Sequence, residues 1–333
     1  MDHTSRIAPS IDELLAGVTS REPIVADDGK SGNWLERVVI GDETFVVKHC
    51  SLEADWISRI IGDREFWTFT LWRGGLFDGL PPCIDAATVA MAIDGSGPDA
   101  ELAILMHDVG AFLVPEGDSV VPVDHHEGFI DHMAALHAAF WGWHDDLGVQ
   151  SMHQRLAMFA PRTIAPELEV DDVPVPIRVA DQGWRLLPDV APDLARIVMA
   201  CHDDATPLID ALGTTPVTFV HGDWKMGNLG RHPDGRTILL DWAYPGAGPA
   251  CWDLMWYLAL NRARLPQSKE QSIDRYRAAL ESCGIATDPW WEQQLGLAHV
   301  AIMVVFGWEK AVGDPAELDW WQQRVVEGSR WLA

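Results

Sequence analysis

Several polar residues with complementary chemistry lie close together in the chain. The stretch HGDWKMGN, residues 221–228, contains Asp223, Lys225 and Asn228, and Asp241 follows within LLDW. Carboxylate and amide oxygens are ligands that suit Mg²⁺, and a further carboxylate can accept the proton of an attacking hydroxyl group. A lysine ammonium group can meet a phosphate as a compact positive charge. Together these residue types are the ones that phosphoryl transfer requires.

Strand patterns around this stretch predict where its side chains lie. PVTFV, residues 216–220, is rich in β-branched and aromatic residues and predicts a strand, and residues 228–242 predict a β-hairpin with a Pro-Asp-Gly turn. A strand, a loop and a hairpin in this order would bring Asp223, Asn228 and Asp241 to one end of one sheet. We therefore expect two carboxylates and an amide to converge there.

A further candidate site residue ends a hairpin in the N-terminal region. WLERVVIGDETFVVK, residues 34–48, has strand-forming residues on both sides of Gly-Asp, which is typical of a β-hairpin. On the two-residue strand period, Lys48 projects from the end of a partly apolar face that could cover a flat ligand. The helical pattern that follows breaks at Gly62 and contains Glu53 and Glu65, both candidates to face the lysine.

A glycine-containing turn precedes this hairpin. Residues 28–33 read DGKSGN, and the backbone near Ser31 could approach a phosphate. The segment is not a P-loop, because Ile24 stands where the GxxxxGK[ST] pattern requires glycine and the strand, loop and helix context is missing. A solvent-exposed turn and a phosphate-binding turn remain the two interpretations.

The chain is long enough for two packed lobes, since it has 333 residues of which 48% are hydrophobic. Short strand patterns dominate as far as ELAILMHDVG, residues 101–110, and helical patterns dominate after it. We therefore assign residues 1–108 to an N-terminal lobe and residues 109–333 to a C-terminal lobe. Residues 161–191 are rich in Pro and Asp, and we expect them to be irregular.

The composition argues against two classes of partner. The chain has 24 Lys and Arg against 50 Asp and Glu, and the resulting formal charge of −26 would repel nucleic-acid phosphates and anionic membranes. The longest apolar run, near residues 295–308, is too short to span a bilayer, so we expect no membrane partner. The same acidity would suit a cationic substrate, although a solvated acidic surface explains it equally well.

Neither the cysteines nor the histidines form a metal or disulfide pattern. The five Cys are scattered without a CxxC pair, which favours a reducing cytoplasm. One predicted helix after residue 124 contains several histidines, but their spacing does not place two of them one turn apart beside a carboxylate. We interpret them as ordinary helix residues. They are His125, His126, His132 and His137.

The motif of the first stretch carries a family resemblance. HGDxxxxN, followed by an apolar pair and Asp-Trp, resembles the signature of the aminoglycoside phosphotransferase and choline kinase family, which is related to the protein kinases. The resemblance is strong over residues 219–254 and looser elsewhere. It implies an α+β, bilobal, protein-kinase-like fold, with a small antiparallel β-sheet and a helix in the N-terminal lobe and a larger, mainly helical C-terminal lobe. It also implies ATP and Mg²⁺ as cofactors.

The resemblance assigns roles to residues of the motif. Asp223 corresponds to the catalytic base, and Asn228 and Asp241 correspond to the magnesium ligands. His221 corresponds to the residue that braces the catalytic loop. Asp253, in PACWDL, corresponds to the acid that follows the metal site and buttresses this loop.

In the N-terminal lobe, which would bind the nucleotide, VVK resembles the strand that carries the ATP-phosphate lysine, here Lys48. Glu65 is its expected helix partner, with Glu53 as the alternative. ILMHDVG resembles the hinge that binds adenine through the backbone. Lys225 departs from many small-molecule kinases and resembles the D-x-K-x-x-N pattern of protein kinases, and we count it among the catalytic residues. The other implied nucleotide-binding positions are Ser31, Met106, His107 and Asp108.

Two classes of function follow. The first is an ATP-dependent kinase for a hydroxyl group of a small molecule, for which the acid surplus and the resemblance suggest an amino sugar, an aminoglycoside or an amino alcohol. The second is a nucleotide-binding regulatory protein with the same fold and no turnover. The set of Asp223, Asn228 and Asp241 favours the enzyme, because a binding protein needs no base. A protein substrate is disfavoured, because YPGAGPACWDL leaves little room for an activation segment.

Overall fold

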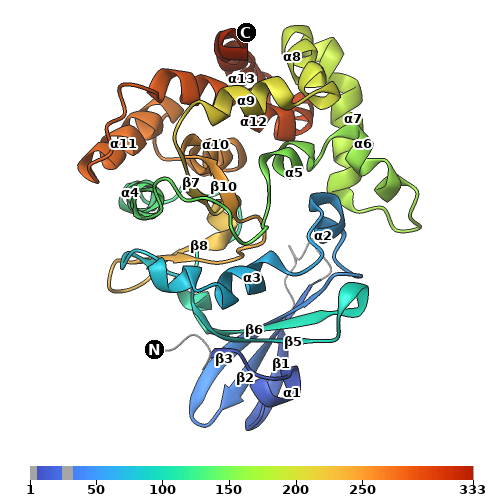
Figure 1. Ribbon diagram of the computed structural model, residues 1–333, viewed down its shortest axis with the longest axis vertical. Coiled ribbons are helices and arrows are strands. Elements are labelled where there is room, and N and C mark those ends of the chain that lie inside the picture. The colour runs from blue at the N-terminus through green and yellow to red at the C-terminus, as the bar shows by residue number, and fades with distance from the viewer. Residues whose placement is uncertain (1–5, 25–32, 333) are drawn as a thin grey trace. The chain divides into compact units, whose positions relative to one another are not determined.

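The structure is a computed structural model that describes residues 6–24 and 33–332 (Figure 1). The chain packs into two compact units. The first unit comprises Met1–Glu116 together with Met226–Ala243, and the second comprises Gly117–Lys225 together with Tyr244–Ala333. The boundary expected after residue 108 gave residues 226–243 to the second lobe. They pack with the first unit because a hairpin within them pairs with a strand of that unit.

The first unit is built on a five-stranded antiparallel sheet with the strand order β1-β2-β3-β6-β5. The predicted hairpin is confirmed, because β2 and β3 pair from Trp34 opposite His49 to Ile40 opposite Glu43. Gly41 at its turn has a φ of +62°, a conformation that glycine adopts without strain. The strands are β1 Val18–Ile24, β2 Trp34–Ile40, β3 Glu43–Ser51, β5 Thr88–Asp94 and β6 Glu101–His107.

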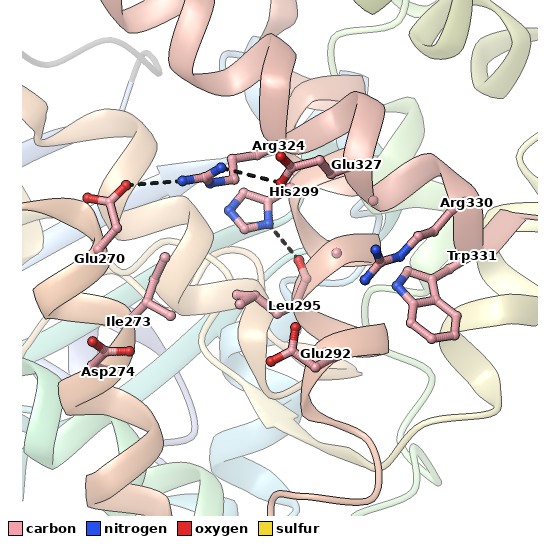
Figure 2. A pocket seen from close by; sticks show the side chains of 12 residues that line it. Glu270, Ile273, Asp274, Glu292, Leu295, His299, Arg324, Glu327, Arg330 and Trp331 are labelled. Carbon is pink, nitrogen blue, oxygen red and sulfur yellow. Dashed lines mark hydrogen bonds and ion pairs between the residues drawn. The ribbon is translucent and has the colours of Figure 1, made fainter.

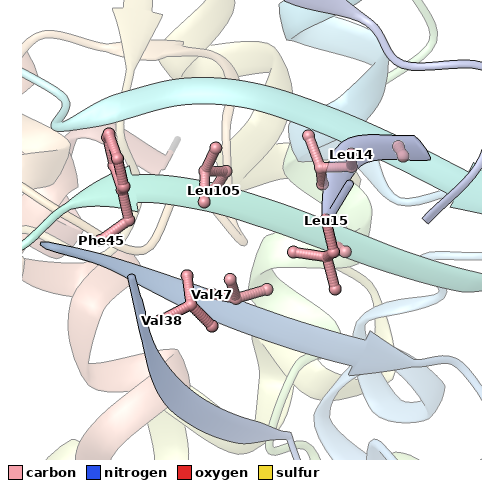
Figure 3. Close-up of a cluster of buried hydrophobic side chains, with 8 residues drawn as sticks. Leu14, Leu15, Val38, Phe45, Val47 and Leu105 are labelled. Atoms are coloured by element: carbon pink, nitrogen blue, oxygen red, sulfur yellow. The ribbon is translucent and has the colours of Figure 1, made fainter. Parts of the chain in front are cut away.

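One face of this sheet is covered by the short helix α1, Ile11–Leu14. Figure 3 shows Leu14 and Leu15 packed with Val38, Val47 and other buried side chains of the strands. Alternation along β3 places every second residue on this apolar face, so Lys48, which follows Val47, belongs to the opposite face. The strand pattern thus presents the lysine away from the core of the sheet.

Two short helices follow the hairpin, α2 Trp56–Ile61 and α3 Trp67–Arg73. Asp55 caps α2 by accepting hydrogen bonds from the backbone N–H groups of its first turn. The helix ends at Gly62, whose φ is +80°, so the predicted break is confirmed. The remaining short elements of this unit are η2 Leu76–Gly79, β4 Ile84–Asp85, η3 Gly97–Asp99 and η4 Gly110–Phe112.

The strands around the motif belong to separate sheets. β7, Val217–Val220, pairs with β10, Gly246–Pro249, whereas the predicted hairpin of β8, Leu229–Arg231, and β9, Thr237–Leu239, pairs with β4. The expectation of one sheet is therefore wrong. The hairpin pairs with β4 through β9, in parallel. The partner of β7 is β10, which follows Asp241 in the chain.

The second unit is mainly helical. Its central helix is α12, which is long and apolar enough to cross a membrane by length and composition, and 78% of its most apolar window is buried inside the protein. The apolar run at residues 295–308 lies in the middle of this helix. The larger helices are α4 Val123–Ala139, α7 Val175–Val190, α8 Pro192–Asp203, α10 Cys251–Leu260, α11 Lys269–Ser282, α12 Trp291–Val312 and α13 Pro315–Gly328. The shorter ones are α5 Met152–Ala157, α6 Pro161–Ile164, η5 Pro166–Leu168, α9 Thr206–Gly213, η7 Arg262–Arg264 and η8 Ser329–Leu332.

The expectation that residues 161–191 are irregular is wrong, because α7 occupies the second half of this segment. Proline is tolerated in the first turn of a helix, where its missing N–H would have no partner, and Pro176 lies in that turn. The helix buries Ile177 and Trp184 on one face. Gly183 on the same helix allows an approach to α12 so close that an added Cβ would lie 2.1 Å from the carbonyl oxygen of Trp308.

Replacing Gly183 by alanine should therefore lower the free energy of unfolding by about 1–3 kcal/mol, because the helices must separate to admit a methyl group. The matched control is Gly213→Ala at the end of α9, where a Cβ would meet nothing within 4 Å. Urea denaturation of both variants checks this. Equal midpoints for the two variants would contradict the close contact between α7 and α12.

Candidate active site

In the first unit, Lys48 and Asp241 form an ion pair, with 2.6 Å between Nζ and Oδ1. Both side chains are partly exposed. Burial alone would lower the pKa of Lys48, but the negative charges of Asp241 and Asp55 outweigh it and raise that pKa above its ordinary value. The lysine is therefore a fixed positive charge on the face of the sheet opposite α1.

The predicted partner of Lys48 is wrong. Glu65 and Glu53 are both exposed, and within the described part of the chain neither forms an ion pair with the lysine. The reason is local: Glu65 lies in the break between α2 and α3, where its N–H donates to Asp63, so it is on no helical face. The buried acid of this region whose charge acts on Lys48 is Asp55, the cap of α2.

Asn228 and Asp241 lie at the same end of the β8–β9 hairpin. The carbonyl oxygen of Asn228 accepts a hydrogen bond of 2.9 Å from the N–H of Leu240, the neighbour of Asp241. The Asn228 side chain is buried, and Asp241 has a φ of +62°, a conformation that non-glycine residues adopt rarely. The register of the hairpin thus places Asn228 on one strand next to Leu240 and Asp241 at the end of the other.

These oxygen donors fit a hard cation. An amide oxygen and a carboxylate are the ligands that Mg²⁺ takes from proteins, with phosphate oxygens and water completing its coordination. Among residues 6–24 and 33–332, no group of three or more His, Cys, Asp or Glu side chains could hold a metal ion. A cation at Asn228 and Asp241 would therefore depend on the nucleotide for the rest of its ligands.

The predicted hinge residues lie at the end of strand β6 and just beyond it. Met106 packs against an apolar cluster of Ala87, Val109 and Ile238, which joins the hinge to the β8–β9 hairpin. Asp108 accepts a 2.8 Å hydrogen bond from Nε of Arg37 on β2, and this bond lowers the pKa of the carboxyl group.

Two further positions complete the predicted nucleotide-binding set. The N–H of His107 donates to the carbonyl oxygen of Ala87 at 2.9 Å, so the strand is held at the hinge by its own unit. Ser31 lies outside the described residues. The first unit thus contains Lys48, the hinge and both proposed metal ligands.

In the second unit, Asp223 is held through both of its carboxylate oxygens. Lys225 Nζ lies 2.7 Å from Oδ2, and Trp256 Nε1 donates to Oδ1 at 2.9 Å. Asp223 is 1% exposed, whereas the Lys225 side chain is 38% exposed. Lys225 therefore contacts the residue to which the sequence resemblance assigns the role of base. Trp256 was missed, because nothing in a sequence rich in tryptophan distinguishes it from core residues.

The backbone of the same loop is tied to Asp253 on α10. The N–H groups of His221 and Gly222 both donate to its carboxylate at 2.8 Å, and the ring of His221 in turn accepts the N–H of Asp223 at 3.2 Å. Both His221 and Asp253 are fully buried. These contacts tie the backbone of residues 221–223 to helix α10.

A buried histidine is hydrogen-bonded to Asp253. His137 on α4 lies 3.1 Å from it through Nε2. The other ring nitrogen, Nδ1, is hydrogen-bonded to the Tyr276 hydroxyl, which itself donates to the carbonyl oxygen of Ala250. Burial alone would raise the pKa of Asp253, but the hydrogen bond and charge of His137 lower it below its ordinary value. His137 is therefore more than an ordinary helix residue.

Gly222 is required by both its conformation and its surroundings. Its φ is +84°, and an added Cβ would lie 2.0 Å from the carbonyl oxygen of Tyr244 and 2.5 Å from Nη1 of Arg155. Arg155 is fully buried and stacks on Trp252 with its central carbon 5.5 Å from the ring centre. Burial lowers the pKa of Arg155 to about 10, so it stays charged behind the loop.

A surface pocket of the second unit lies away from these residues. It is bounded by α11, α12, α13 and η8, and Figure 2 shows Arg324 between Glu270 and Glu327, at 3.4 and 3.3 Å. His299 lies in its wall, and burial lowers the pKa of its ring to about 4. None of the predicted site residues lines this pocket. The Lys225–Asp223 pair and the Lys48–Asp241 pair are thus the chemically distinctive features of the described chain.

An antiparallel sheet with a paired lysine, a mainly helical unit and a buried aspartate in a braced loop define a kinase-like phosphotransferase. The chain belongs to the APH phosphotransferase enzyme family, whose model matches residues 98–287, more than half of the chain. The suspected family is thereby confirmed. No curated protein sequence matches the chain.

Solved structures show the same fold at low sequence identity. Choline kinase LicA from Streptococcus pneumoniae is 13% identical, with 95% of each chain covered and a TM-score of 0.51. An amicoumacin kinase, hAmiN, solved with AMP-PNP, Ca²⁺ and Ami, is 14% identical, with 97% of this chain and 91% of that chain covered and a TM-score of 0.50. The predicted α+β, protein-kinase-like fold class is confirmed.

Replacing Asp253 by asparagine should lower the free energy of unfolding by about 3–5 kcal/mol at neutral pH, because the amide cannot make all the hydrogen bonds that the buried carboxylate makes with His221, Gly222 and His137. The folded-state pKa of Asp253 lies below its ordinary 3.8, so its stabilisation is present above that pH and is lost as the pH falls through the folded value. Urea denaturation between neutral and acidic pH measures the difference between the two proteins.

The matched control is Asp274→Asn, which changes an exposed carboxylate on α11 and should have little effect. A stability difference for Asp253→Asn that stays constant throughout the acidic range would contradict the charge-based role of Asp253.

Proposed function

We propose that the protein transfers the terminal phosphoryl group of ATP, with Mg²⁺, to a hydroxyl group of a small molecule. The observation that carries the proposal is Asp223, a buried carboxylate fixed through both oxygens in a loop whose backbone is itself anchored to Asp253. The two side-chain contacts fix the position of both carboxylate oxygens. This position is built to keep a carboxylate immobile.

The first unit supplies the elements that nucleotide binding needs. Lys48 provides a permanent positive charge for phosphate oxygens, and the apolar cluster next to Met106 offers a surface for a flat base beside the end of β6. Asn228 and Asp241 would hold Mg²⁺. When bound, this ion would neutralise charge on the phosphates.

The chemistry of the second unit is proton acceptance. As the hydroxyl oxygen of the substrate forms a bond to the terminal phosphorus, the bond from that phosphorus to the bridging oxygen breaks and ADP leaves. The hydroxyl proton passes to Asp223 and then to solvent. Lys225, whose ammonium group already lies 2.7 Å from this carboxylate, neutralises charge on the transferred group.

The chain geometry supports a small acceptor. β10 begins at Gly246, only a few residues after Asp241, and α10 follows it directly, so no long segment is available to bind a peptide. The net charge of −26 supports an acceptor with ammonium groups, such as an amino sugar, an aminoglycoside or an amino alcohol. The two similar structures are a choline kinase and an amicoumacin kinase. Five free cysteines agree with a cytoplasmic setting.

Asp223→Asn should abolish most turnover, by about 10²- to 10⁴-fold, while leaving nucleotide binding intact, because the amide keeps the shape of the base but cannot accept the proton. ADP release with Mg²⁺ and ATP is measured against pools of aminoglycosides, amino sugars, neutral sugars and amino alcohols. A pool that stimulates release only in the unaltered protein identifies the acceptor class. Equal stimulation of both proteins would exclude Asp223 as the base.

Asp241→Asn should weaken Mg²⁺-dependent ATP binding by about tenfold or more, because it removes a charged ligand of the ion. Calorimetric titration with ATP, in Mg²⁺ and in EDTA, separates this effect from the loss of the Lys48 pair, since only the former requires the metal. Asp42→Asn in the exposed turn between β2 and β3 is the control for charge alone. Identical Mg²⁺ dependence in the Asp241→Asn and unaltered proteins would rule out the ligand role.

A further inference from the structure

Trp256 makes a contact that its burial alone does not explain. Its indole N–H donates to Oδ1 of Asp223 at 2.9 Å, and the two residues are 2% and 1% exposed. Most tryptophans in protein cores contribute area, and a buried indole N–H takes whatever acceptor lies near. Here the acceptor is the carboxylate proposed to take the substrate proton, and a hydrogen bond to a charged group is stronger than one to a neutral acceptor.

Helix α10 holds the catalytic loop at two points, one turn apart. Asp253 accepts the backbone N–H groups of His221 and Gly222, and Trp256 donates to the side chain of Asp223. Residues three apart lie on the same face of a helix, so both contacts come from one face of α10. The backbone of the loop and the Asp223 carboxylate are thereby both held by one helix.

The Trp256 ring is itself fixed by aromatic neighbours. Phe306 on α12 lies 4.7 Å from it in an edge-to-face arrangement, and Tyr244 and Trp252 lie 5.9 and 6.1 Å away. All four rings are buried. The indole therefore has no room to turn its N–H away from Asp223, whereas Lys225 on Oδ2 is partly exposed and has a flexible stem.

We propose that Trp256 is a positioning residue of the phosphoryl-transfer reaction. It holds Oδ1 and thereby fixes the plane of the Asp223 carboxylate, so that Oδ2, the oxygen next to Lys225, receives the hydroxyl proton. The proposal rests on the proposed function. Without the indole donor, the carboxylate stays buried but loses the contact that sets its orientation. A displacement of a catalytic group by about 1 Å can lower the rate of the chemical step by about 10²-fold.

The kinetic test compares Trp256→Phe with Trp308→Phe. Trp308 is also a buried member of this aromatic cluster, 6.5 Å from Phe306, and its N–H has no hydrogen-bond partner in the described chain, so the control removes the same atoms without touching the base. We expect kcat to fall about 10- to 100-fold in Trp256→Phe, with KM for ATP and acceptor changed less than about threefold. Trp308→Phe should keep kcat within about threefold.

Coupling to the base separates positioning from general packing. In the Asp223→Asn background, Trp256→Phe should cause no further loss of residual turnover, because the group it orients no longer accepts a proton. A purely structural role would lower kcat equally in both backgrounds, or equally in the two Trp→Phe variants. Either result would overturn the proposal.

A spectroscopic measurement keeps the proposal testable if Trp256→Phe does not fold, or if no acceptor is found. In ¹⁵N-labelled protein, the Trp256 indole signal should move upfield in Asp223→Asn, because an amide oxygen is a weaker acceptor than a carboxylate. An unmoved signal would overturn the contact. A moved signal without turnover in any pool would count against the proposed function alone, so the two failures are distinguishable.

Discussion

A buried carboxylate, Asp253, is the constraint on which the candidate site depends. An ionised group without water is tolerated only when its lone pairs meet donors, and here these are the N–H groups of His221 and Gly222 and the ring of His137. If the loop moved away, the buried Asp253 carboxylate would lose two hydrogen-bond donors. If the carboxylate were removed, the loop would lose the acceptor that holds its backbone. The conformation of the HGD segment, including the left-handed Gly222, therefore follows from the need to satisfy one anion.

The two functional acids share this dependence on their surroundings. Asp241 lies in the left-handed region, which costs a non-glycine residue free energy, and it is held by Lys48 from a strand far away in sequence. Asp223 follows a glycine that no other residue could replace without displacing Tyr244 or Arg155. At Asp241, a tertiary contact supports a backbone conformation that local preference would not choose, and at Gly222 the surroundings exclude every side chain.

The features predicted correctly from the sequence are local. The β2–β3 hairpin follows from a period of two around Gly-Asp, and the loop from the spacing of its polar residues. The features missed are contacts between distant segments. Lys48 and Asp241 are 193 positions apart in the sequence, and His137 and Asp253 are 116 positions apart. The spacing of apolar residues in a helix predicts which residues share a face, but it does not predict which acidic residue that face will contact. The helix α7 was missed for a different reason, because proline was taken as a breaker, whereas the helix has Pro176 in its first turn and Pro188 near its end.

The abundance of tryptophan shows how packing and chemistry can reside in one side chain. Of the 17 Trp, several are buried with an indole N–H that has no hydrogen-bond partner in the described chain, among them Trp72, Trp252 and Trp308. Each gains from burying its large apolar surface and loses part of that gain through the unpaired donor. Trp256 avoids this loss because its donor meets a charge. The same ring excludes water from Asp223 and replaces the hydrogen bond that water would have given, and a fixed donor needs no reorganisation when the charge on the base changes during reaction.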